Sequence, residues 1–399
     1  MIHPSIRAHR LVLGLLLVGN TLAFAGVDPV TRTLTALAAV ALAVDLKEQL
    51  PFVPRIHTRA AIALAALLVL QLLPWPAFVH RILQPGLAPF LPHGLWPLSV
   101  APWATVQAAA ALVVAGILAL TASRMAATRS GLPALLILLA AIGALLGLLG
   151  LATEPGIPGK VLMIRDNTGG GGPYGPFVNH NHFAVAVELT LPACLALFMA
   201  ATRHLRVPGE GRRGAAITIL ATGTAMAVSA AALLRSGSRG GALFLAAGAF
   251  LTFPLWSRRR RHQPWIWAMA AILVLGAGTA VLAWNRLPEL QDRFKQLVAL
   301  QGAEGNTRLD LWTGTVKLCR RSPVVGCGAG AYRYAINLDK PPTGSLELRH
   351  AHNDWLEWTA DTGLVGAAIL LGTVGGLLWL LAPARVRRIR FEHRYALAA

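Results

Sequence analysis

The hydrophobic positions of this chain fall into long apolar runs that short polar stretches separate. Ten of these runs are candidates for membrane-spanning helices, because crossing the hydrocarbon core takes roughly 17–25 mostly apolar residues. Several are rich in Ala and Gly, which favours close helix–helix packing. The pattern predicts an all-α polytopic membrane protein whose spans are, in chain order, Leu11–Val27, Val30–Val44, Ala60–Trp75, Trp103–Thr121, Leu132–Ala152, His182–Ala201, Gly214–Leu234, Gly241–Trp256, Trp265–Trp284 and Gly363–Leu381.

Basic residues give these spans an orientation. Cytoplasmic segments of membrane proteins carry an excess of Lys and Arg, and one assignment satisfies this rule throughout. With the N-terminus in the cytoplasm, the short outer connections hold few basic residues. Every cytoplasmic segment is then basic, through Arg7 and Arg10; Lys47, Arg55 and Arg59; Arg124 and Arg129; Arg203, Arg206, Arg212 and Arg213; Arg258 to Arg261; and Arg385, Arg387, Arg388, Arg390 and Arg394.

One outer segment, residues 285–350, is long and polar and holds ten Lys or Arg residues. Long loops escape the charge rule, so this charge is available to a ligand. The segment is predicted to contain an amphipathic helix over Leu290–Leu300 and a second helix over Arg308–Arg321, capped by Asn306 or Thr307.

Glycine and proline punctuate the rest of this segment. Pro323 follows the end of the second predicted helix. Gly326–Gly330 has the spacing of a dinucleotide-binding turn, but no strand precedes it and no βαβ unit surrounds it, so we interpret it as a tight turn between helices. Lys340–Ser345 is predicted to be a flexible segment that could admit or cover a substrate. Three further arginines are expected to be solvated, namely Arg320, Arg321 and Arg349.

Composition agrees with the membrane assignment. The chain is 55% hydrophobic and only 13% charged, whereas soluble domains carry about 25% charged residues. Its net charge of +19 is weak evidence for nucleic-acid binding, because basic cytoplasmic loops face anionic lipid. Three cysteines do not form a disulfide framework. Cys319 and Cys327 share the long outer segment, where an oxidising compartment would permit a bridge, and the sequence leaves this pairing open.

Three dense polar stretches stand at the ends of apolar runs, and the topology places all of them on the outer side. They are Gly175–Ala184, Ser236–Gly241 and His350–Trp355. Polar and ionisable groups at membrane depth are costly and usually functional. Their common side therefore predicts a single active site.

The ordered set of these motifs resembles the O-antigen ligase and polymerase superfamily. The resemblance is carried by Gly-Pro-Phe-Val-Asn-His-Asn-His-Phe-Ala, Ser-Arg-Gly-Gly, Thr307-Arg308 with Trp312 ahead of Gly-Cys-Gly-Ala-Gly, and His352-Asn-Asp with Asp361-Thr-Gly363. It covers about Ala221 to Gly375, and the motif Asn179–Glu188 extends it upstream. Relatives usually carry further helices after the His-Asn-Asp helix, whereas one apolar run follows here. Nothing before residue 150 matches.

The resemblance implies a bacterial inner-membrane glycosyltransferase, similar in fold to GT-C-like enzymes, with its active site facing the periplasm. It implies transfer of a glycan from an undecaprenyl-diphosphate-linked donor to an acceptor hydroxyl, in lipopolysaccharide or surface-polysaccharide biosynthesis. The acceptor stays open between a lipid A core sugar, a growing glycan and a protein hydroxyl. The domain division that follows is 1–152 for N-terminal transmembrane helices and 153–399 for the catalytic region, including a periplasmic loop over 285–351.

Two arginines are candidates for holding the donor's diphosphate. Arg239 lies at the outer end of a span, where the charge rule disfavours it, and Arg308 lies in the long outer segment, four residues before Trp312. A planar guanidinium matches phosphate oxygens bidentately, and stacking on the indole would orient Arg308. The alternative for Arg239 is an interfacial arginine that snorkels to the headgroups. The resemblance implies that both arginines bind the lipid diphosphate.

His352 is the candidate catalytic residue. An imidazole with an ordinary pKa of about 6.5 suits a general base that acts on a sugar hydroxyl near neutral pH. The family resemblance implies this role, and the alternative is a histidine that only packs at the start of the last span. Asn353 and Asp354 are grouped with it as substrate-binding residues. Glu357 and Asp361, further along, are candidates to pair with the two arginines.

The remaining substrate-binding candidates are Asn179, Asn181, His182 and Glu188. Asn181 and Glu188 are seven residues apart and hence on one helical face, and an acid inside a span is a functional hypothesis by default. A buried structural hydrogen bond would explain Glu188 equally well. No HExxH motif or cysteine pair supports a metal site, so we predict neither metal nor cofactor.

Two other functional classes compete with the enzyme. An ion-coupled transporter would use Glu188 and the helix kink that Pro192 predicts. Against it, the polar motifs gather on one side of the membrane, and no convincing inverted repeat is present. A purely structural scaffold would leave the clustered Arg and His residues unexplained. The expected partners are therefore the lipid-linked donor, a glycan, lipid A core or protein acceptor, and membrane lipid, with no nucleic acid.

Overall fold

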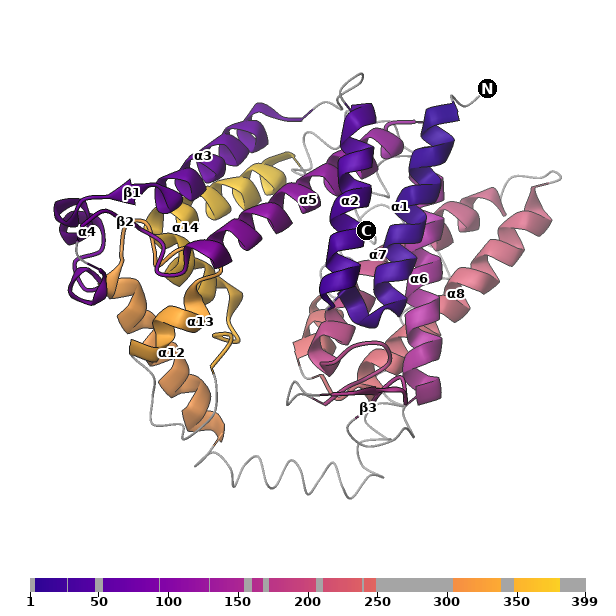
Figure 1. Cartoon of the computed structure of the whole chain (residues 1–399). Coiled ribbons are helices and arrows are strands. Elements are labelled where there is room, and N and C mark those ends of the chain that lie inside the picture. Colours follow the sequence, from indigo (N-terminus) through magenta and orange to yellow (C-terminus); the bar gives the residue numbers. More distant parts are fainter. Residues whose placement is uncertain are drawn as a thin grey trace. The chain divides into compact units, whose positions relative to one another are not determined.

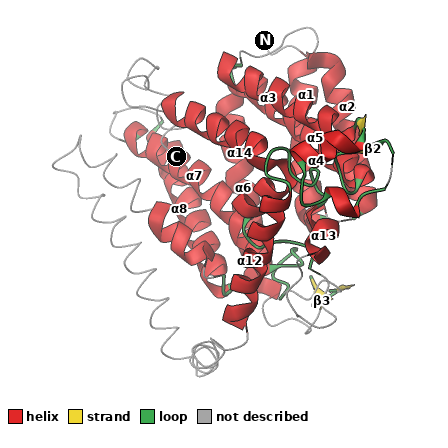
Figure 2. Ribbon diagram, turned by 90° about the vertical axis from the view of Figure 1, so that its left-hand side faces the viewer, coloured by secondary structure: helices red, strands yellow, loops and turns green. Residues whose placement is uncertain are grey.

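Helices make up nearly all of the regular structure (Figure 2). The computed structural model describes residues 4–26, 28–46, 53–92, 94–128, 130–153, 160–167, 172–205, 211–238, 240–248, 304–338 and 348–380. Its helices are α1 (Pro4–Leu22), η1 (Phe24–Gly26), α2 (Pro29–Leu46), α3 (Arg55–Leu72), α4 (Ala77–Leu83), η2 (Ala88–Phe90), α5 (Pro102–Ala126), α6 (Gly131–Thr153), α7 (His180–His204), α8 (Arg212–Arg235), α12 (Glu304–Arg321), α13 (Tyr332–Ala335), η4 (Ile336–Leu338) and α14 (Asp354–Leu380).

Six of the described helices are long and apolar enough to cross a membrane, namely α3, α5, α6, α7, α8 and α14. Each coincides with a predicted span, which confirms an all-α polytopic membrane protein. The boundaries differ most for three helices: α3 is Arg55–Leu72, so Trp75 lies beyond it, α5 extends to Ala126, and α14 begins at Asp354. Of the predicted span Gly241–Trp256, residues 241–248 are helical. The rest of that span, the span Trp265–Trp284 and the helix predicted over Leu290–Leu300 lie outside the described residues.

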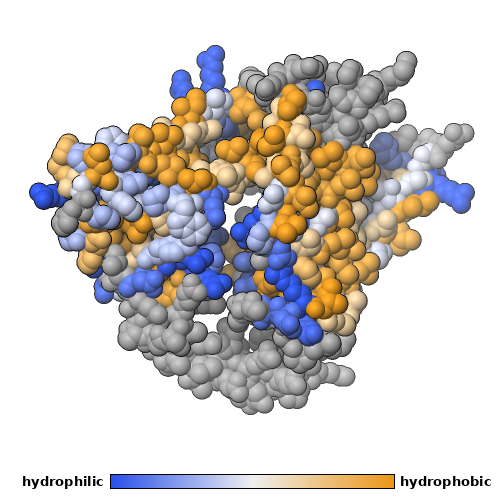
Figure 3. All heavy atoms as spheres, viewed as in Figure 1, coloured by the Kyte–Doolittle hydropathy of each residue, from blue (hydrophilic) through white to orange (hydrophobic). Residues whose placement is uncertain are grey.

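Large apolar side chains face outward along these helices (Figure 3). On α2 the exposed positions recur every three or four residues and form one stripe, through Val30, Leu34, Leu37, Val40 and Val44. Such a stripe on a soluble protein would mark an interaction site. On a helix of this composition it is the surface that lipid covers.

The described chain forms two compact units, one from residues 1–51, 117–287 and 383–399 and the other from residues 52–116 and 288–382. The boundary between them falls within α5. These units group residues by packing, whereas the predicted division at residue 152 separated the family-like region from the rest. That division stays a prediction.

In the first unit, α6, α7 and α8 pack closely because small residues line their contacts (Figure 1). A Cβ at Gly143 of α6 would collide with the Thr190 hydroxyl of α7. Ser229 of α8 donates a hydrogen bond to the Gly143 carbonyl at 2.9 Å. This confirms the close helix–helix packing that the Ala- and Gly-rich composition predicts, since small residues let helix backbones approach closely.

The short strands of the first unit lie between α6 and α7. β3 (Lys160–Val161) pairs antiparallel with β4 (Arg165–Asp166), with Val161 opposite Arg165. Arg165 also binds the Asp28 carboxylate at 2.8 Å and lies 4.8 Å from the centre of the Phe24 ring. These contacts attach the β3–β4 ribbon to the connection between α1 and α2.

In the second unit, the connection between α3 and α5 is folded against α12 and α14. It contains α4, η2 and an antiparallel ribbon in which β1 (Pro74–Trp75) pairs with β2 (Trp96–Pro97), Trp75 standing opposite Trp96. Arg321, expected to be solvated, instead donates to the Gly86 carbonyl at 3.2 Å and lies 5.4 Å from the centre of the Phe90 ring. The solvated interpretation of Arg321 was therefore wrong.

Helix α12 begins at Glu304 rather than at Arg308, so Asn306 and Thr307 lie inside its first turn and do not cap it. Its end at Arg321, ahead of Pro323, is as predicted. The following turn, Gly326–Gly330, has three glycines in the left-handed region, at φ 73°, 112° and 72° for residues 326, 328 and 330. This confirms a tight turn between helices. The segment Lys340–Ser345 lies outside the described residues.

Helix α14 is interrupted at Gly363, which has φ 64° and ψ −168°. The backbone of Leu364 there donates to the Pro323 carbonyl at 2.8 Å. A Cβ at Gly363 would collide with the Val324 carbonyl. Residues 354–362 are thus packed against the turn that follows α12, and the apolar part of α14 begins where the sequence predicts, at Gly363.

Candidate functional site

The first unit brings together two of the polar motifs that the sequence separates. Asn179 caps α7, because its side-chain oxygen accepts the Asn181 backbone N–H at 2.8 Å. The Ser238 hydroxyl, from the connection after α8, donates to Asn181 Oδ1 at 2.8 Å. It also accepts the Gly241 backbone N–H at 3.2 Å. The entry of α7 and the motif Ser236–Gly241 therefore form one polar cluster.

Glu188 belongs to the same face of α7, seven residues after Asn181. Its Oε1 is buried and has no hydrogen-bond partner among the described residues. A Cβ placed on Gly241 would lie 2.6 Å from the Ala184 side chain and 3.4 Å from Glu188 Oε1. Glycine at position 241 thus lets this segment approach the carboxylate. His182, one position after Asn181, is exposed.

In the second unit, the turn that carries His352 stands immediately before α14. His352 has φ 51°, in the left-handed region, and its side chain is exposed. Positive φ is uncommon for residues other than glycine and often marks functional sites. Asn353 Oδ1 accepts the Leu356 backbone N–H at 3.2 Å and so caps α14, and Asp354 is exposed in its first turn.

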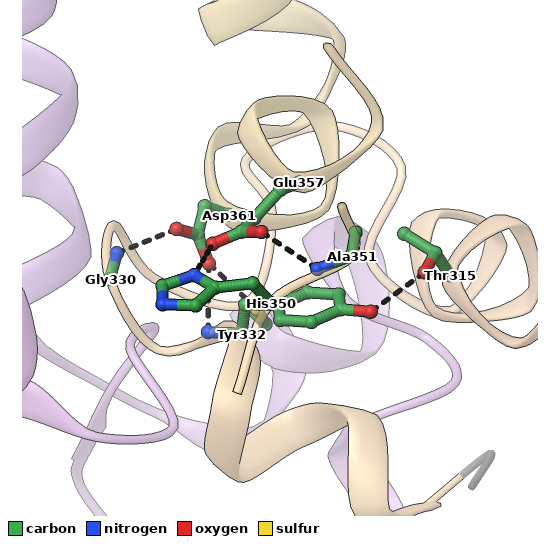
Figure 4. Close-up of polar contacts among 8 residues, drawn as sticks. Thr315, Gly330, Tyr332, His350, Ala351, Glu357 and Asp361 are labelled. Carbon is green, nitrogen blue, oxygen red and sulfur yellow. Dashed lines mark hydrogen bonds and ion pairs between the residues drawn. The ribbon is translucent and has the colours of Figure 1, made fainter. Parts of the chain in front are cut away.

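Ala351, the residue before His352, is fully buried, and both its carbonyl and its backbone N–H form hydrogen bonds. Its carbonyl accepts the indole N–H of Trp312 on α12 at 3.0 Å. Its backbone N–H donates to Glu357 Oε2 on α14 at 2.8 Å. The other oxygen, Glu357 Oε1, lies 2.9 Å from His350 Nδ1 (Figure 4). One carboxylate therefore contacts both residues that precede His352.

The environment of His350 raises the pKa of its imidazole above the ordinary 6.5. The hydrogen bond to Glu357 is the largest cause, and the charges of Glu357 and Asp354 act in the same direction. Partial burial and the charge of Arg333 oppose the shift. His350 side-chain exposure is 68%, so solvent weakens the pair.

Asp361, one turn further along α14, is buried and organises the glycine turn (Figure 4). Its Oδ2 accepts the Gly330 backbone N–H at 2.7 Å, and its Oδ1 accepts the Tyr332 backbone N–H at 2.8 Å. The Cys327 thiol lies 3.7 Å from Oδ1. The carboxylate thus ties the start of α13 to α14. Buried amides and a buried carboxylate each avoid a large desolvation cost through this arrangement.

Two buried glutamines support the same turn, Gln71 from α3 and Gln84 from the connection between α3 and α5. Gln71 Nε2 donates to the carbonyls of Val325 and Asp361 at 2.7 and 2.9 Å, and Gln71 Oε1 accepts the Ala329 N–H at 3.0 Å. Gln84 Nε2 donates to the carbonyls of Leu98 and Gly326 at 2.6 and 2.7 Å. The turn is therefore held from α14 and from the segment around α4.

The two cysteines near this turn are free thiols rather than a disulfide. Burial raises the pKa of the Cys319 thiol to about 11, and burial together with the Asp361 charge raises the pKa of Cys327 further. Tyr332 is similar: burial raises its pKa to about 12, and its hydroxyl lies 2.8 Å from the Thr315 hydroxyl. These groups stay protonated at neutral pH and act as packing and hydrogen-bonding groups.

Residues 224–371 match the family model described as O-antigen ligase. This part of the chain is similar to the O-antigen ligase family. The matched region lies close to the interval 221–375 on which the motifs suggested the superfamily, and it contains Arg239, Arg308 and His352. The family points to a membrane enzyme of glycosyltransferase or ligase type that uses lipid-linked glycan. No curated protein and no solved structure matches the chain.

The structure describes some of the predicted site residues in the matched region and not others. Arg239 lies outside the described residues, and Arg308 lies in α12 with an undescribed side chain. The indole of Trp312, expected to stack on Arg308, is engaged with Ala351. Glu357 and Asp361, considered as partners of the arginines, instead use their carboxylate oxygens on His350, Ala351 and the glycine turn.

Sequence reasoning missed the supports of the ligase-family domain. Gln71 and Gln84 lie before residue 150, where no family motif was found, and each is a single polar residue beside apolar positions. A polar residue near the end of a span is the signal that could have found them, since an amide there needs hydrogen-bond partners. Within the described ranges, no group of three His, Cys, Asp or Glu side chains is arranged to hold a metal ion.

Proposed function

We propose that the protein transfers a glycan from an undecaprenyl-diphosphate-linked donor to an acceptor hydroxyl at the periplasmic face of a bacterial inner membrane. The observation that carries the proposal is the O-antigen ligase family match over residues 224–371. It spans two of the three motifs that the topology assigns to the outer side, Ser236–Gly241 and His350–Trp355. The six apolar helices supply the membrane setting in which a polyprenyl donor is held.

His352 is the proposed general base. The acceptor hydroxyl donates its proton to the imidazole while its oxygen forms a bond to the anomeric carbon of the donor sugar. The bond from that carbon to the diphosphate oxygen breaks, the lipid diphosphate leaves with the electron pair, and the configuration inverts. The exposed side chain of His352, on a turn whose preceding residue is hydrogen-bonded on both sides, supports this role.

Arg239 and Arg308 are the proposed diphosphate clamp. Two guanidinium groups would offset the charge that develops on the leaving diphosphate, so a metal ion is not needed for this step. Both arginines lie in the matched region of the ligase family. The proposal requires the two side chains and the His352 imidazole to reach one pyrophosphate–sugar junction.

The polar cluster of the first unit is the proposed second binding element. Asn181 and His182 stand at the outer end of α7 beside Ser238, and Glu188 lies one to two turns deeper. We propose that Asn179, Asn181, His182 and Glu188 bind substrate hydroxyls, and that Asn353 and Asp354 do so beside His352. The buried Glu188 Oε1, which has no partner among the described residues, supports this assignment.

We favour a ligase or polymerase, with a lipid A core sugar or a growing glycan as acceptor. A protein O-oligosaccharyltransferase uses the same donor chemistry and is the alternative within this class. From another class, an ion-coupled transporter is favoured by one observation, the buried Glu188 oxygen in a spanning helix that contains Pro192. Solute uptake by reconstituted vesicles that Glu188→Gln abolishes would support the transporter.

The deciding experiment is glycolipid analysis of a strain that lacks the gene. We expect lipid-linked glycan to accumulate and one glycan product to disappear, and the identity of the missing product names the acceptor. Wild-type protein should restore the product, whereas His352→Ala protein that is inserted at wild-type level should not. Unchanged glycolipids in the deletion strain would overturn the proposed function, and full product with His352→Ala would overturn the base assignment.

A further inference from the structure

We propose that Glu357 is the positioning residue for His352, holding the base in place through the backbone of Ala351 and the side chain of His350. The inference rests on the proposed function, because it assigns a role relative to the base of that reaction. It extends that function to a residue that the sequence considered only as a partner for the clamp arginines.

The first argument is the geometry of the carboxylate. Glu357 lies one turn inside α14, and its own backbone N–H donates to the Asn353 carbonyl at 2.9 Å, so its position is fixed by the helix. Its two oxygens accept separately, one from the Ala351 N–H at 2.8 Å and one from His350 Nδ1 at 2.9 Å. Glu357 thereby binds the two residues that directly precede His352, and His352 lies in the chain between them and Glu357.

The second argument is that the attachment is completed from another helix. Trp312 on α12 donates its indole N–H to the Ala351 carbonyl at 3.0 Å. The peptide groups on both sides of the Ala351 Cα are thus hydrogen-bonded, and its side chain is fully buried. His352 follows at φ 51° with an exposed side chain. Its backbone is held while its imidazole is accessible, as a base that meets an incoming hydroxyl requires.

The third argument concerns charge. The groups that face His350 are Glu357 and Asp354 on α14, which raise its pKa, and Arg333 on α13, which lowers it. The net shift is upward, and the largest cause is the Glu357 hydrogen bond. The contact between imidazolium and carboxylate is therefore complete below the ordinary pKa and is lost as pH rises through the raised one. Arg349, next in the chain, is exposed.

Opposite pH requirements follow for the two histidines. His352 accepts a proton and must be neutral, so activity rises with pH through its pKa. His350 strengthens the Glu357 attachment when it is protonated, so activity falls as pH passes its raised pKa. We therefore expect a bell-shaped pH profile of kcat in which the alkaline limb depends on His350 and Glu357.

The test measures glycan transfer by the full chain in membrane vesicles, with lipid-linked glycan supplied by the host membranes. Displacing a reacting group by about 1 Å can cost about 100-fold in rate. We expect Glu357→Ala to lower kcat about 100-fold and Glu357→Gln about tenfold, because glutamine retains one acceptor oxygen for the Ala351 N–H. The KM for the lipid-linked donor should stay within about twofold of wild type, since the proposed diphosphate contacts are elsewhere. Asp310→Asn, which removes an exposed carboxylate on α12, is the matched control and should leave both constants unchanged.

The pH profile separates positioning from a merely structural role. His350→Gln should remove the alkaline limb with a loss of about threefold or less at pH 6.5, and His350→Arg should keep the activity and extend it to higher pH. In ¹⁵N-histidine spectra of the detergent-solubilised chain, Glu357→Gln should lower the pKa of His350. This last result does not depend on transfer at all.

The outcomes distinguish the two proposals. Absence of transfer by wild-type protein, or full transfer by His352→Ala, is a failure of the proposed function. If wild type transfers and His352→Ala does not, then wild-type kcat and an unchanged alkaline limb in both Glu357→Gln and His350→Gln overturn the positioning role. A rise in donor KM with kcat unchanged would also overturn it, by showing that Glu357 binds substrate.

Discussion

The carboxylates in the polar clusters of the two units differ in whether their oxygens have hydrogen-bond partners. In the second unit, Asp361 and Glu357 each use both carboxylate oxygens on groups of the protein itself. In the first unit, Glu188 has a buried oxygen with no partner among the described residues. A carboxylate with satisfied oxygens stabilises its surroundings, whereas one with an unpaired oxygen lowers stability and is retained for another reason. The comparison distinguishes carboxylates that stabilise the fold from one that is proposed to bind substrate.

The largest expected effect tests the scaffold side of this comparison. Asp361→Ala leaves the buried amides of Gly330 and Tyr332 without an acceptor, which should destabilise the chain by about 3 kcal/mol. The shift in thermal unfolding of the detergent-solubilised protein measures it, with Asp310→Ala as the exposed control. Unfolding at the wild-type temperature in Asp361→Ala would show that this carboxylate is not a scaffold group.

Two glycines with nearly equal φ give the next test. Gly326 has φ 73° and a Cβ there would collide with the Asp361 backbone, whereas Gly237 has φ 74° and open space around it. Replacing either glycine by Ala puts a side chain on a residue in the left-handed region, which lowers the free energy of unfolding by about 1 kcal/mol. Gly326→Ala should cost at least about 1–2 kcal/mol more, because its neighbours must shift. Equal thermal shifts in the two variants would contradict the close packing around residue 326.

The hydrogen bonds of Ser238, which connect two polar motifs of the first unit, should contribute less to the free energy of unfolding. Ser238→Ala removes the hydrogen bond to Asn181 and the acceptor for the Gly241 N–H. We expect a loss of about 1–2 kcal/mol, since one hydrogen bond and one helix cap each contribute about 1 kcal/mol. Thr218→Ala is a suitable control, because that exposed hydroxyl donates only to Gly214 of its own helix. A loss no greater than that of the control would mean that the two motifs are not coupled.

A pH effect on stability should be smaller still. The pKa of His350 is raised in the folded chain, mainly by Glu357. Its stabilisation is therefore complete below the ordinary pKa of about 6.5 and is lost as pH rises through the raised value. The pair is largely exposed, so we expect about 0.5 kcal/mol or less between pH 6 and pH 9. Thermal unfolding of wild type and His350→Gln should differ at pH 6 and coincide at pH 9, and the reverse order would refute the sign.

Glu188→Gln should have the smallest effect on stability, within about 0.5 kcal/mol of zero, because the variant removes a charge from a buried oxygen that lacks a described partner. If Glu188 binds substrate, transfer should still fall, by about tenfold through KM. The pair Asp361→Ala and Glu188→Gln thus tests the difference between the two carboxylates directly. A large loss of stability in Glu188→Gln would reassign this carboxylate to the scaffold.

The sequence predicted the features that depend on local pattern. The spans follow from apolar composition, the end of α12 from the proline at position 323, and the tight turn from the spacing of Gly326–Gly330. Features that depend on distant backbone could not be predicted in this way. Gln71 bonds to carbonyls of residues 325 and 361, about 250 and 290 positions away. The periodicity of apolar residues along the chain gives no information about hydrogen bonds between such distant positions.

The same limit applies to the carboxylates of α14, whose pairing with the proposed clamp arginines stays a prediction. Acidic residues near proposed arginine clamps suggest ion pairs, because only side chains are visible in a sequence. The partners of Asp361 are backbone amides of a glycine turn, and one partner of Glu357 is the amide of Ala351. Backbone donors acquire positions only once the turn is folded, so these roles required the structure.

The two buried glutamines, Gln71 in α3 and Gln84 in the α3–α5 connection, also bear on how this chain can be divided into fragments. A fragment that starts at residue 153 would retain the entire O-antigen ligase match yet lack Gln71 and Gln84. In that fragment the buried carbonyls of Val325 and Gly326 would have no side-chain donor, and the buried N–H of Ala329 would have no side-chain acceptor. Leaving buried polar groups without these partners is costly. The stretch that a family search recognises is for this reason not a portable module, and attempts to express it alone should yield an insoluble or misassembled product.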